Sequence, residues 1–238
     1  LDHVLAKAGE RVGAGRAEAL GGLAGRGVDL DALDAFDGDL APAGQQFGLA
    51  GAEIDAVMIA TPDHTHFPLA MHAMASGKHV YLEKPLAHTF REVDLLISMA
   101  ARSGVVTQMG NQGHSGNNYF QFKAWSEAGI IADATKIVMF MNSERRWHGW
   151  RIDGFPSGEP MPPGLDWDLW HAARPVRPYS TKLHPLTWRG WFDFGNGSIG
   201  NMGCHVRDGV FWALKVDHPT GVEAEEIRGG SNERYPTG

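Results

Sequence analysis

Three short polar segments follow apolar runs in the chain, and each carries side chains that can hold charge or move protons. They are residues 61–66 (TPDHTH), 83–85 (EKP) and 110–114 (GNQGH). A fourth segment, GSIGNMGCHVRD at residues 197–208, contains His205 with Asp208 three residues beyond it. Lysine, histidine and carboxylate groups at such places could act as general acids or bases. Histidine is suited to this because its imidazole titrates near neutral pH.

The elements that must position the first three segments are expected to alternate between strand and helix. Short apolar runs predict strands over 54–60, 79–82 and 105–109, while helical spacing of apolar residues predicts helices over 66–76 and 92–102. Such an alternation with short connections is typical of a parallel sheet. Ligands of such sheets bind outside the carboxyl ends of the strands. The three polar segments are therefore expected on one edge.

The chain changes character in its second half. All eight tryptophans lie between Trp125 and Trp212. We expect helices over 119–127 and 209–215 and a strand over 134–142, and the intervening proline-rich stretch is expected to be irregular. The compositional change predicts a boundary between a domain at 1–115 and a domain at 116–238.

The overall composition excludes some functional classes. The chain has 238 residues, of which 43% are hydrophobic and 21% charged, as in ordinary globular proteins. A formal net charge of −7 argues against nucleic acid as a partner. No apolar run approaches the roughly 18 residues of a membrane span, so no membrane partner is expected. With Cys204 as the one cysteine, no internal disulfide can form, and this thiol is expected to be an inert small filler.

The first fifty residues offer only a partial dinucleotide-binding turn. Gly13 and Gly15 supply the first two glycines of G-x-G-x-x-G, but Glu18 stands at the third position. Asp37, about 20 residues further on, fits the acid that binds a cofactor ribose. An alanine- and glycine-rich helix explains the stretch about as well.

The motifs together resemble the Gfo/Idh/MocA family of NAD(P)-dependent oxidoreductases over residues 51–225. The resemblance rests on IDAVMIATPDHTH, VYLEKPLA and GSIGNMGCHVRD in this order. It implies an α/β fold, with a Rossmann-like parallel-sheet domain followed by an α+β domain with a largely antiparallel sheet. It also implies NAD or NADP as cofactor, a carbohydrate substrate and a homo-oligomer. The family is longer, so we expect a chain truncated at both ends.

The resemblance also implies roles for single residues. Lys84 would bind and polarise a substrate oxygen, with a pKa lowered by partial burial, and His205 would be the general acid or base. Asn201 stands where the family has aspartate; it could hydrogen-bond the substrate or orient His205, but it cannot share a proton. A cis peptide bond is expected between Lys84 and Pro85. The expected cofactor-binding residues are Thr61, Pro62, Asp63, His66, Glu83, Pro85, Gly13, Gly15, Asp37 and Arg189; the expected substrate-binding residues are Gln112, His114, Trp188 and Asp208.

Other interpretations of the same residues stay open. Residues 83–85 could be a surface ion pair before an ordinary turn, His205 a core histidine, and Trp188 with Arg189 part of the core. Trp167, Trp170 and Trp212 are expected to be core or interface residues. The H-x-H of residues 64–66 could hold a metal together with His205, although no further acidic ligand is evident, so no metal is expected.

The preferred hypothesis is an enzyme that oxidises a sugar or polyol hydroxyl with NAD or NADP. One alternative is an NAD-dependent glycoside hydrolase of the same family. Another is a remnant without cofactor that binds carbohydrate or serves in assembly, which the incomplete glycine turn favours. A metal-dependent hydrolase comes last. The expected location is the cytoplasm, or the periplasm if an export signal precedes Leu1.

Overall fold

The computed structural model describes residues 54–140, 154–216 and 219–223, which fall into two compact units. Residues 54–60 and 66–109 belong to the first unit, whereas residues 61–65 belong to the second unit with the described residues from 110 onward. The expected glycine turn with Gly13, Gly15 and Asp37 lies outside the described residues. The predicted boundary at 115/116 stays a prediction.

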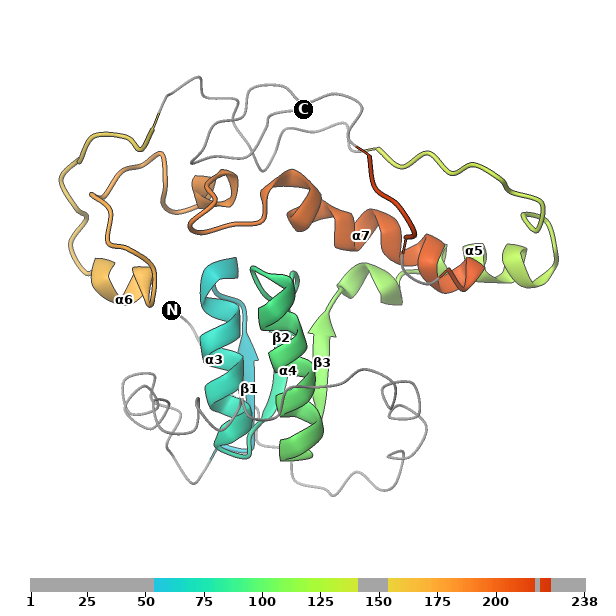
Figure 1. The fold of residues 1–238 in the computed structure, drawn as a ribbon, viewed down its shortest axis with the longest axis horizontal. Coiled ribbons are helices and arrows are strands. Elements are labelled where there is room, and N and C mark those ends of the chain that lie inside the picture. Colours follow the sequence, from blue (N-terminus) through green and yellow to red (C-terminus); the bar gives the residue numbers. More distant parts are fainter. Residues whose placement is uncertain (1–53, 141–153, 217–218, 224–238) are drawn as a thin grey trace. The chain divides into compact units, whose positions relative to one another are not determined.

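The first unit is a small parallel α/β layer (Figure 1). Its elements are β1 (Ala56–Ile59), α3 (Asp63–Ala75), β2 (His79–Glu83), α4 (Phe90–Ser103) and β3 (Thr107–Gly110). The strands lie in the order β1-β2-β3, and β1 pairs in parallel with β2, with Ala56 opposite His79 and Ile59 opposite Leu82. Val80 N–H donates to the Val106 carbonyl at 3.0 Å. The alternating strands and helices predicted for this region are confirmed.

Local sequence signals set the ends of α4. The Thr89 hydroxyl accepts a hydrogen bond from Glu92 N–H at 3.2 Å, and the Glu92 carboxylate accepts one from Thr89 N–H at 2.9 Å. This reciprocal pair satisfies two amide groups that an uncapped helix would leave open. Gly104 ends the helix in the left-handed conformation, with φ of 64°, which glycine adopts without a steric penalty.

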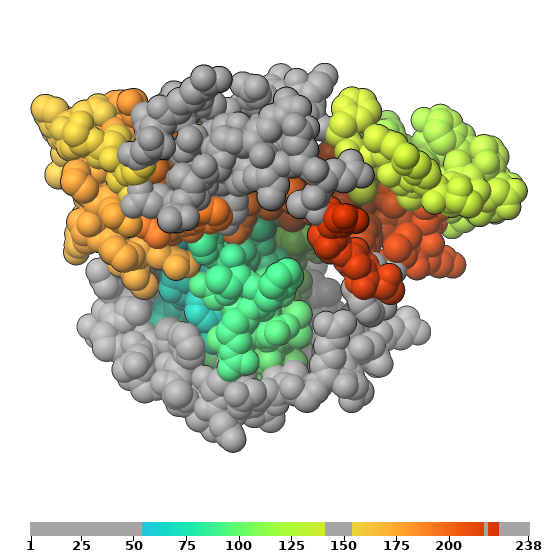
Figure 2. All heavy atoms as spheres, turned by 45° about the horizontal axis from the view of Figure 1, so that its top comes forward, coloured from blue at the N-terminus to red at the C-terminus, as the bar shows by residue number. Residues whose placement is uncertain are grey.

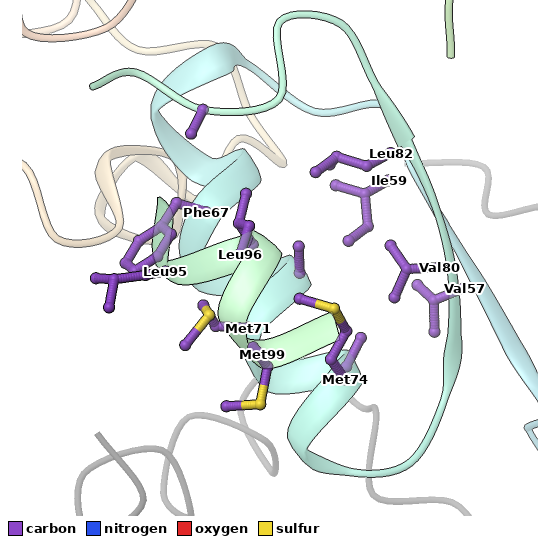
Figure 3. Close-up of a cluster of buried hydrophobic side chains, with 13 residues drawn as sticks. Val57, Ile59, Phe67, Met71, Met74, Val80, Leu82, Leu95, Leu96 and Met99 are labelled. Carbon is purple, nitrogen blue, oxygen red and sulfur yellow. The ribbon is translucent and has the colours of Figure 1, made fainter. Parts of the chain in front are cut away.

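The core of the first unit lies between the sheet and the two helices (Figure 3). Ile59 is 3% exposed while its neighbour Met58 is 48% exposed, as the two-residue period of a strand requires. The buried side chains are Val57, Ile59, Phe67, Ala70, Met71, Ala73, Met74, Val80, Leu82, Ala87, Leu95, Leu96 and Met99. Both helices therefore cover the same face of the strands, which fixes the carboxyl ends of β1 and β2.

The second unit is built from helices and loops around an aromatic core. Its helices are the short 3₁₀ helix η1 (Gln112–Ser115), α5 (Asn117–Glu127), α6 (Trp167–His171), the 3₁₀ helix η2 (Thr187–Gly190) and α7 (Gly197–Leu214). The core comprises Trp167, Tyr179, Leu183, Trp188, Trp191 and Phe194, with Trp170 packed against it. The rings of Trp167 and Trp170 stack with centroids 4.5 Å apart. Trp167 and Trp170 are thus core residues.

Two predictions for the second unit need correction. Residues 134–140 form no strand; they are exposed along their length and can be followed in yellow-green in Figure 2. A single extended segment cannot form a ladder without a neighbouring strand. The helix predicted over 209–215 begins at Gly197, because the glycine-rich segment 197–208 is also helical. No helix among the described residues has the length and apolar character needed to span a bilayer.

Candidate functional site

The turn after β2 presents Lys84 at the carboxyl end of a parallel strand. Lys84 is half-buried, its N–H lies 3.3 Å from the Glu83 carboxylate, and the Lys84–Pro85 peptide is cis, as the resemblance implied. The Pro85 carbonyl accepts a hydrogen bond from Nδ1 of His66 at 2.6 Å. His66 is 1% exposed and comes from the first turns of α3. The hydrogen bond from His66 therefore stabilises the backbone next to Lys84.

His64, two residues earlier, belongs to the second unit and is held by two backbone carbonyls. Its Nε2 lies 2.8 Å from the Trp170 carbonyl oxygen and its Nδ1 3.3 Å from that of Phe194. Burial lowers the pKa of His64 from 6.5 to about 4, although both carbonyl hydrogen bonds act to raise it. Nearby Arg174 and His171 lower this pKa slightly further. His64 is therefore neutral near pH 7 and has one ring N–H, which donates from Nε2 to the Trp170 carbonyl, while the backbone N–H of His64 donates to the Phe194 carbonyl at 3.2 Å.

The other residues of segment 61–65 are also held by local contacts. The Thr65 hydroxyl donates to the Pro62 carbonyl at 2.8 Å and lies 2.7 Å from the Thr61 hydroxyl. Asp63 is buried at the start of α3, where a carboxylate interacts favourably with the helix dipole. Among the residues that the structure describes, no cluster of three or more histidine, cysteine or acidic side chains could hold a metal ion.

His205 lies on α7 beside a cavity of about 260 Å³. Its Nδ1 is 2.9 Å from Oδ1 of Asn111, a buried residue directly after β3. Asn111 Nδ2 in turn donates to the Cys204 carbonyl at 3.4 Å. The cavity is lined by Asn118, Tyr119, Phe122, His205, Val206, Gly209 and Val210. A small polar ligand in this cavity would meet an imidazole whose Nδ1 is already engaged.

Residues from α5 and η1 surround the same stretch of α7. The Tyr119 hydroxyl donates to the His205 carbonyl at 2.6 Å, and burial followed by the charge of Asp208 raises the pKa of Tyr119. His114 Nδ1 lies 2.8 Å from the Asp208 carboxylate, and its ring is 4.6 Å from that of Trp212. Asp208 thus lies on the same helix α7 as His205 and hydrogen-bonds His114.

The other expected site residues are dispersed over the second unit. Asn201 is buried on α7, one turn before His205, whereas Gln112 is exposed in η1. Trp188 is buried in the aromatic core, and its indole N–H donates to the Pro185 carbonyl at 3.1 Å. The Arg189 guanidinium lies 4.0 Å from the centre of the Trp188 ring. Roles for these four in ligand binding stay predictions.

The contacts of Asn111, Tyr119 and His64 were not predicted from the sequence. Asn111 lies inside the GNQGH segment, but its partner His205 is 94 positions away, and nothing in the sequence pairs the two. Tyr119 stands at the start of a predicted helix, and nothing in the sequence indicates its contact with His205. For His64 the H-x-H pattern was visible, yet the pattern does not separate a ring held by backbone carbonyls from a metal ligand.

Comparison with known proteins identifies the family. Residues 46–111 match the NAD-binding Rossmann fold of the Gfo/Idh/MocA oxidoreductase family, and residues 120–230 match the family's C-terminal α/β domain. The chain belongs to the Gfo/Idh/MocA family. The match confirms the Rossmann-like fold and the NAD-type cofactor expected for the first domain. The antiparallel sheet expected for the second domain is not tested by it.

Curated relatives match shorter parts of the chain. UDP-N-acetylglucosamine 3-dehydrogenase of Acidithiobacillus ferrooxidans is 45% identical over 60 residues, 25% of this chain and 19% of that protein. Inositol 2-dehydrogenase 1 of Saccharopolyspora erythraea is 32% identical over 101 residues, which are 42% of this chain and 30% of that protein. Glycosyl hydrolase family 109 protein 1 of Shewanella sp. ANA-3 is 31% identical over 101 residues, which are 42% of this chain and 22% of that protein.

These matches span less than a third of each relative's length. Solved structures that resemble the chain, such as an inositol dehydrogenase homologue from Azotobacter vinelandii, reach a TM-score of 0.35 over 37% of the chain and 24% of that structure at 28% identity. That likeness is too slight to support a structural argument.

Proposed function

We propose that this protein oxidises a hydroxyl group of a sugar or polyol with NAD or NADP as the electron acceptor. The observation that carries the proposal is the match of residues 46–111 to an NAD-binding Rossmann fold, in which Lys84 stands at the carboxyl end of β2. The sugar and polyol dehydrogenases among the relatives support the substrate class.

The described residues fit the nicotinamide end of such a cofactor. Glu83 and Lys84 place an acceptor and a donor, both half-buried, at the strand edge where Rossmann-type sheets bind ligands. When bound, the cofactor supplies the acceptor for the hydrogen and electron pair that leave the substrate carbon. The proposed cofactor-binding residues are Thr61, Pro62, Asp63, His66, Glu83, Pro85 and Arg189, with Gly13, Gly15 and Asp37 outside the described residues.

The chain's own residues supply the proton chemistry of the proposal. Lys84 donates a hydrogen bond to the substrate oxygen and stabilises the negative charge that develops there. His205 accepts the hydroxyl proton as the carbonyl forms, and returns it in the reverse reaction. Asn201, Gln112, His114, Trp188 and Asp208 are proposed to orient the substrate or the two catalytic side chains.

A glycoside hydrolase that uses the same oxidation transiently is the second candidate. The 31% identity over 101 residues to a glycosyl hydrolase family 109 protein favours it. Oxidation of a ring hydroxyl acidifies the neighbouring C–H, so the glycosidic bond can be eliminated before the carbonyl is reduced again. Release of the leaving group without net reduction of NAD would identify this activity and exclude a simple dehydrogenase.

Two further proposals concern the second domain and the assembly of the protein. We propose that the second domain contains a largely antiparallel sheet, and that the protein assembles as a homo-oligomer through this domain. Light scattering of the purified protein would test the assembly, and a monomer at micromolar concentration would exclude it.

Cofactor binding followed by turnover tests the main proposal. Addition of NAD or NADP should quench tryptophan fluorescence, and a panel of sugars and polyols should then yield the reduced cofactor. Lys84→Ala should lower kcat by about 10²-fold or more and retain cofactor binding. Lys78→Ala, at the amino end of the same strand β2, is the matched control and should keep both properties. Absence of binding at millimolar cofactor would refute the proposal and favour a cofactor-less, carbohydrate-binding protein.

A further inference from the structure

The hydrogen bonds of Asn111 determine how its amide is oriented. One end of the amide faces the Cys204 carbonyl oxygen at 3.4 Å, and the other faces Nδ1 of His205 at 2.9 Å. A carbonyl oxygen only accepts hydrogen bonds, so the NH₂ group of Asn111 must face Cys204. Oδ1 of Asn111 therefore faces His205.

This orientation in turn determines where His205 carries its proton. Oδ1 of an amide accepts and cannot donate, so Nδ1 of His205 must be the donor of the 2.9 Å hydrogen bond. A neutral imidazole carries one N–H, which leaves Nε2 with its lone pair. Nε2 is then the atom that accepts a proton, and after protonation Nδ1–H still donates to Asn111. The same hydrogen bond serves both states of the ring.

We propose that Asn111 is a positioning residue that fixes His205 in the Nδ1–H tautomer, so that Nε2 takes the hydroxyl proton of the substrate. The inference rests on the function proposed above. In the step concerned, the hydroxyl proton passes to Nε2, and the hydrogen on carbon leaves with the C–H electron pair to the oxidised cofactor. The substrate carbon is oxidised to a carbonyl, so atoms and electrons balance.

Burial and chemistry both support Asn111 in this role. Asn111 is buried, and it directly follows β3, so its backbone is set by the end of a strand. Because its amide is neutral, it orients the imidazole without stabilising the imidazolium ion as a carboxylate would. The nearby carboxylate of Asp208 is hydrogen-bonded to His114. His205 itself lines the 260 Å³ cavity, where a small ligand could reach its ring.

Nuclear magnetic resonance of the full chain with ¹⁵N-labelled histidine tests the tautomer directly. Spectra of His205→Gln assign the signals of the ring. We expect the wild-type ring in the Nδ1–H form, and Asn111→Leu should shift it toward the Nε2–H form. Asn111→Asp should keep Nδ1–H and raise the midpoint of the ring's titration by about 1 to 3 pH units. Asn118→Leu, an exposed residue of the same cavity, is the matched control and should change neither property.

Kinetics of the same variants complete the test. Asn111→Leu should lower kcat by roughly 10²-fold with a smaller change in KM, while Asn111→Asp should retain more activity and move the acid limb of the pH profile upward. An Nε2–H ring in the wild type, or a tautomer unchanged in Asn111→Leu, would overturn the inference. A wild-type ring in the Nδ1–H form together with no NAD-dependent turnover would refute the proposed function while supporting the tautomer assignment.

Discussion

The histidines in the first turn of α3 are held differently from His205 on α7 and its neighbour His114. His64 and His66 are 3% and 1% exposed, and their ring nitrogens face backbone carbonyls. His205 is half-buried beside a cavity and bonds the side chain of Asn111, and His114, 41% exposed at its side chain, bonds that of Asp208. The buried rings that face backbone carbonyls help to stabilise the fold, whereas the His205 ring lies beside a cavity where a ligand can reach it.

The difference matters because the four residues look alike in the sequence. All of them follow predicted strands or stand in a polar segment, and the H-x-H at 64–66 even resembles a metal site. What separates them is burial and the kind of partner. Burial raises the free energy of a charged imidazole, so a buried histidine serves poorly as an acid or base near neutral pH.

The largest expected effect concerns His205. Replacement by alanine should lower kcat by about 10² to 10⁴-fold, because the general base is lost. The free energy of unfolding should change by less than about 1 kcal/mol, since His205 is only half-buried. Steady-state kinetics and urea titration measure the two quantities. If the variant unfolds more easily but turns over substrate normally, His205 stabilises the fold, as His66 does, and is not the general base.

The next effect is a pH dependence caused by His64. Its pKa is about 4 in the folded protein and 6.5 when exposed, so the unfolded chain binds this proton first as the pH falls. Stability should be fully present above pH 6.5 and decrease by roughly 3 kcal/mol as the pH falls to 4. The pKa values of His171 and His184 are also lowered, mainly by burial, and act in the same direction.

Urea titrations at several pH values measure this loss. His64→Gln should flatten the curve between pH 6.5 and 4, whereas His114→Gln, at a half-buried position on the other side of the comparison, is the control and should not. An unchanged slope in His64→Gln would show that the burial of His64 is not the cause of this loss of stability.

The smallest of the three effects concerns His66. Replacement by leucine removes the donor to the Pro85 carbonyl and should cost about 1 to 3 kcal/mol of unfolding free energy. His66→Gln keeps an N–H donor and should recover part of the loss. Thermal or urea unfolding measures both variants. If leucine leaves stability unchanged but abolishes cofactor binding, His66 contacts the cofactor rather than the turn.

Local signals made the first unit predictable and long-range contacts made the second unit difficult. Gly104 and the apolar runs of β1 and β2 act within a few residues, so the strands and helices there were predicted nearly to their ends. The glycine-rich sequence at the start of α7 does not indicate a helix, yet a helix forms there, and α7 is stabilised by contacts with α5 and η1. The strand expected at 134–142 had the right composition, but composition does not provide a partner strand.

The residues of the candidate site also differ in how well the sequence predicts them. Lys84 was found because EKP is contiguous and its meaning depends only on the end of one strand. The pairing of His205 with Asn111, and of His114 with Asp208, joins residues 94 positions apart. A single sequence contains no signal for such pairs, so the near neighbour Asn201 was expected to orient His205.

The assignment of residues 61–65 to the second unit has a consequence for recombining this protein with its relatives. A chimaera that exchanges residues 54–109 as one block would replace His64 and keep the resident carbonyls of Trp170 and Phe194, which bind it. Grafts that leave residues 61–65 with the resident C-terminal half preserve these hydrogen bonds. The chain is therefore best recombined at two internal crossovers, around residues 60 and 66, as well as at the boundary near 110.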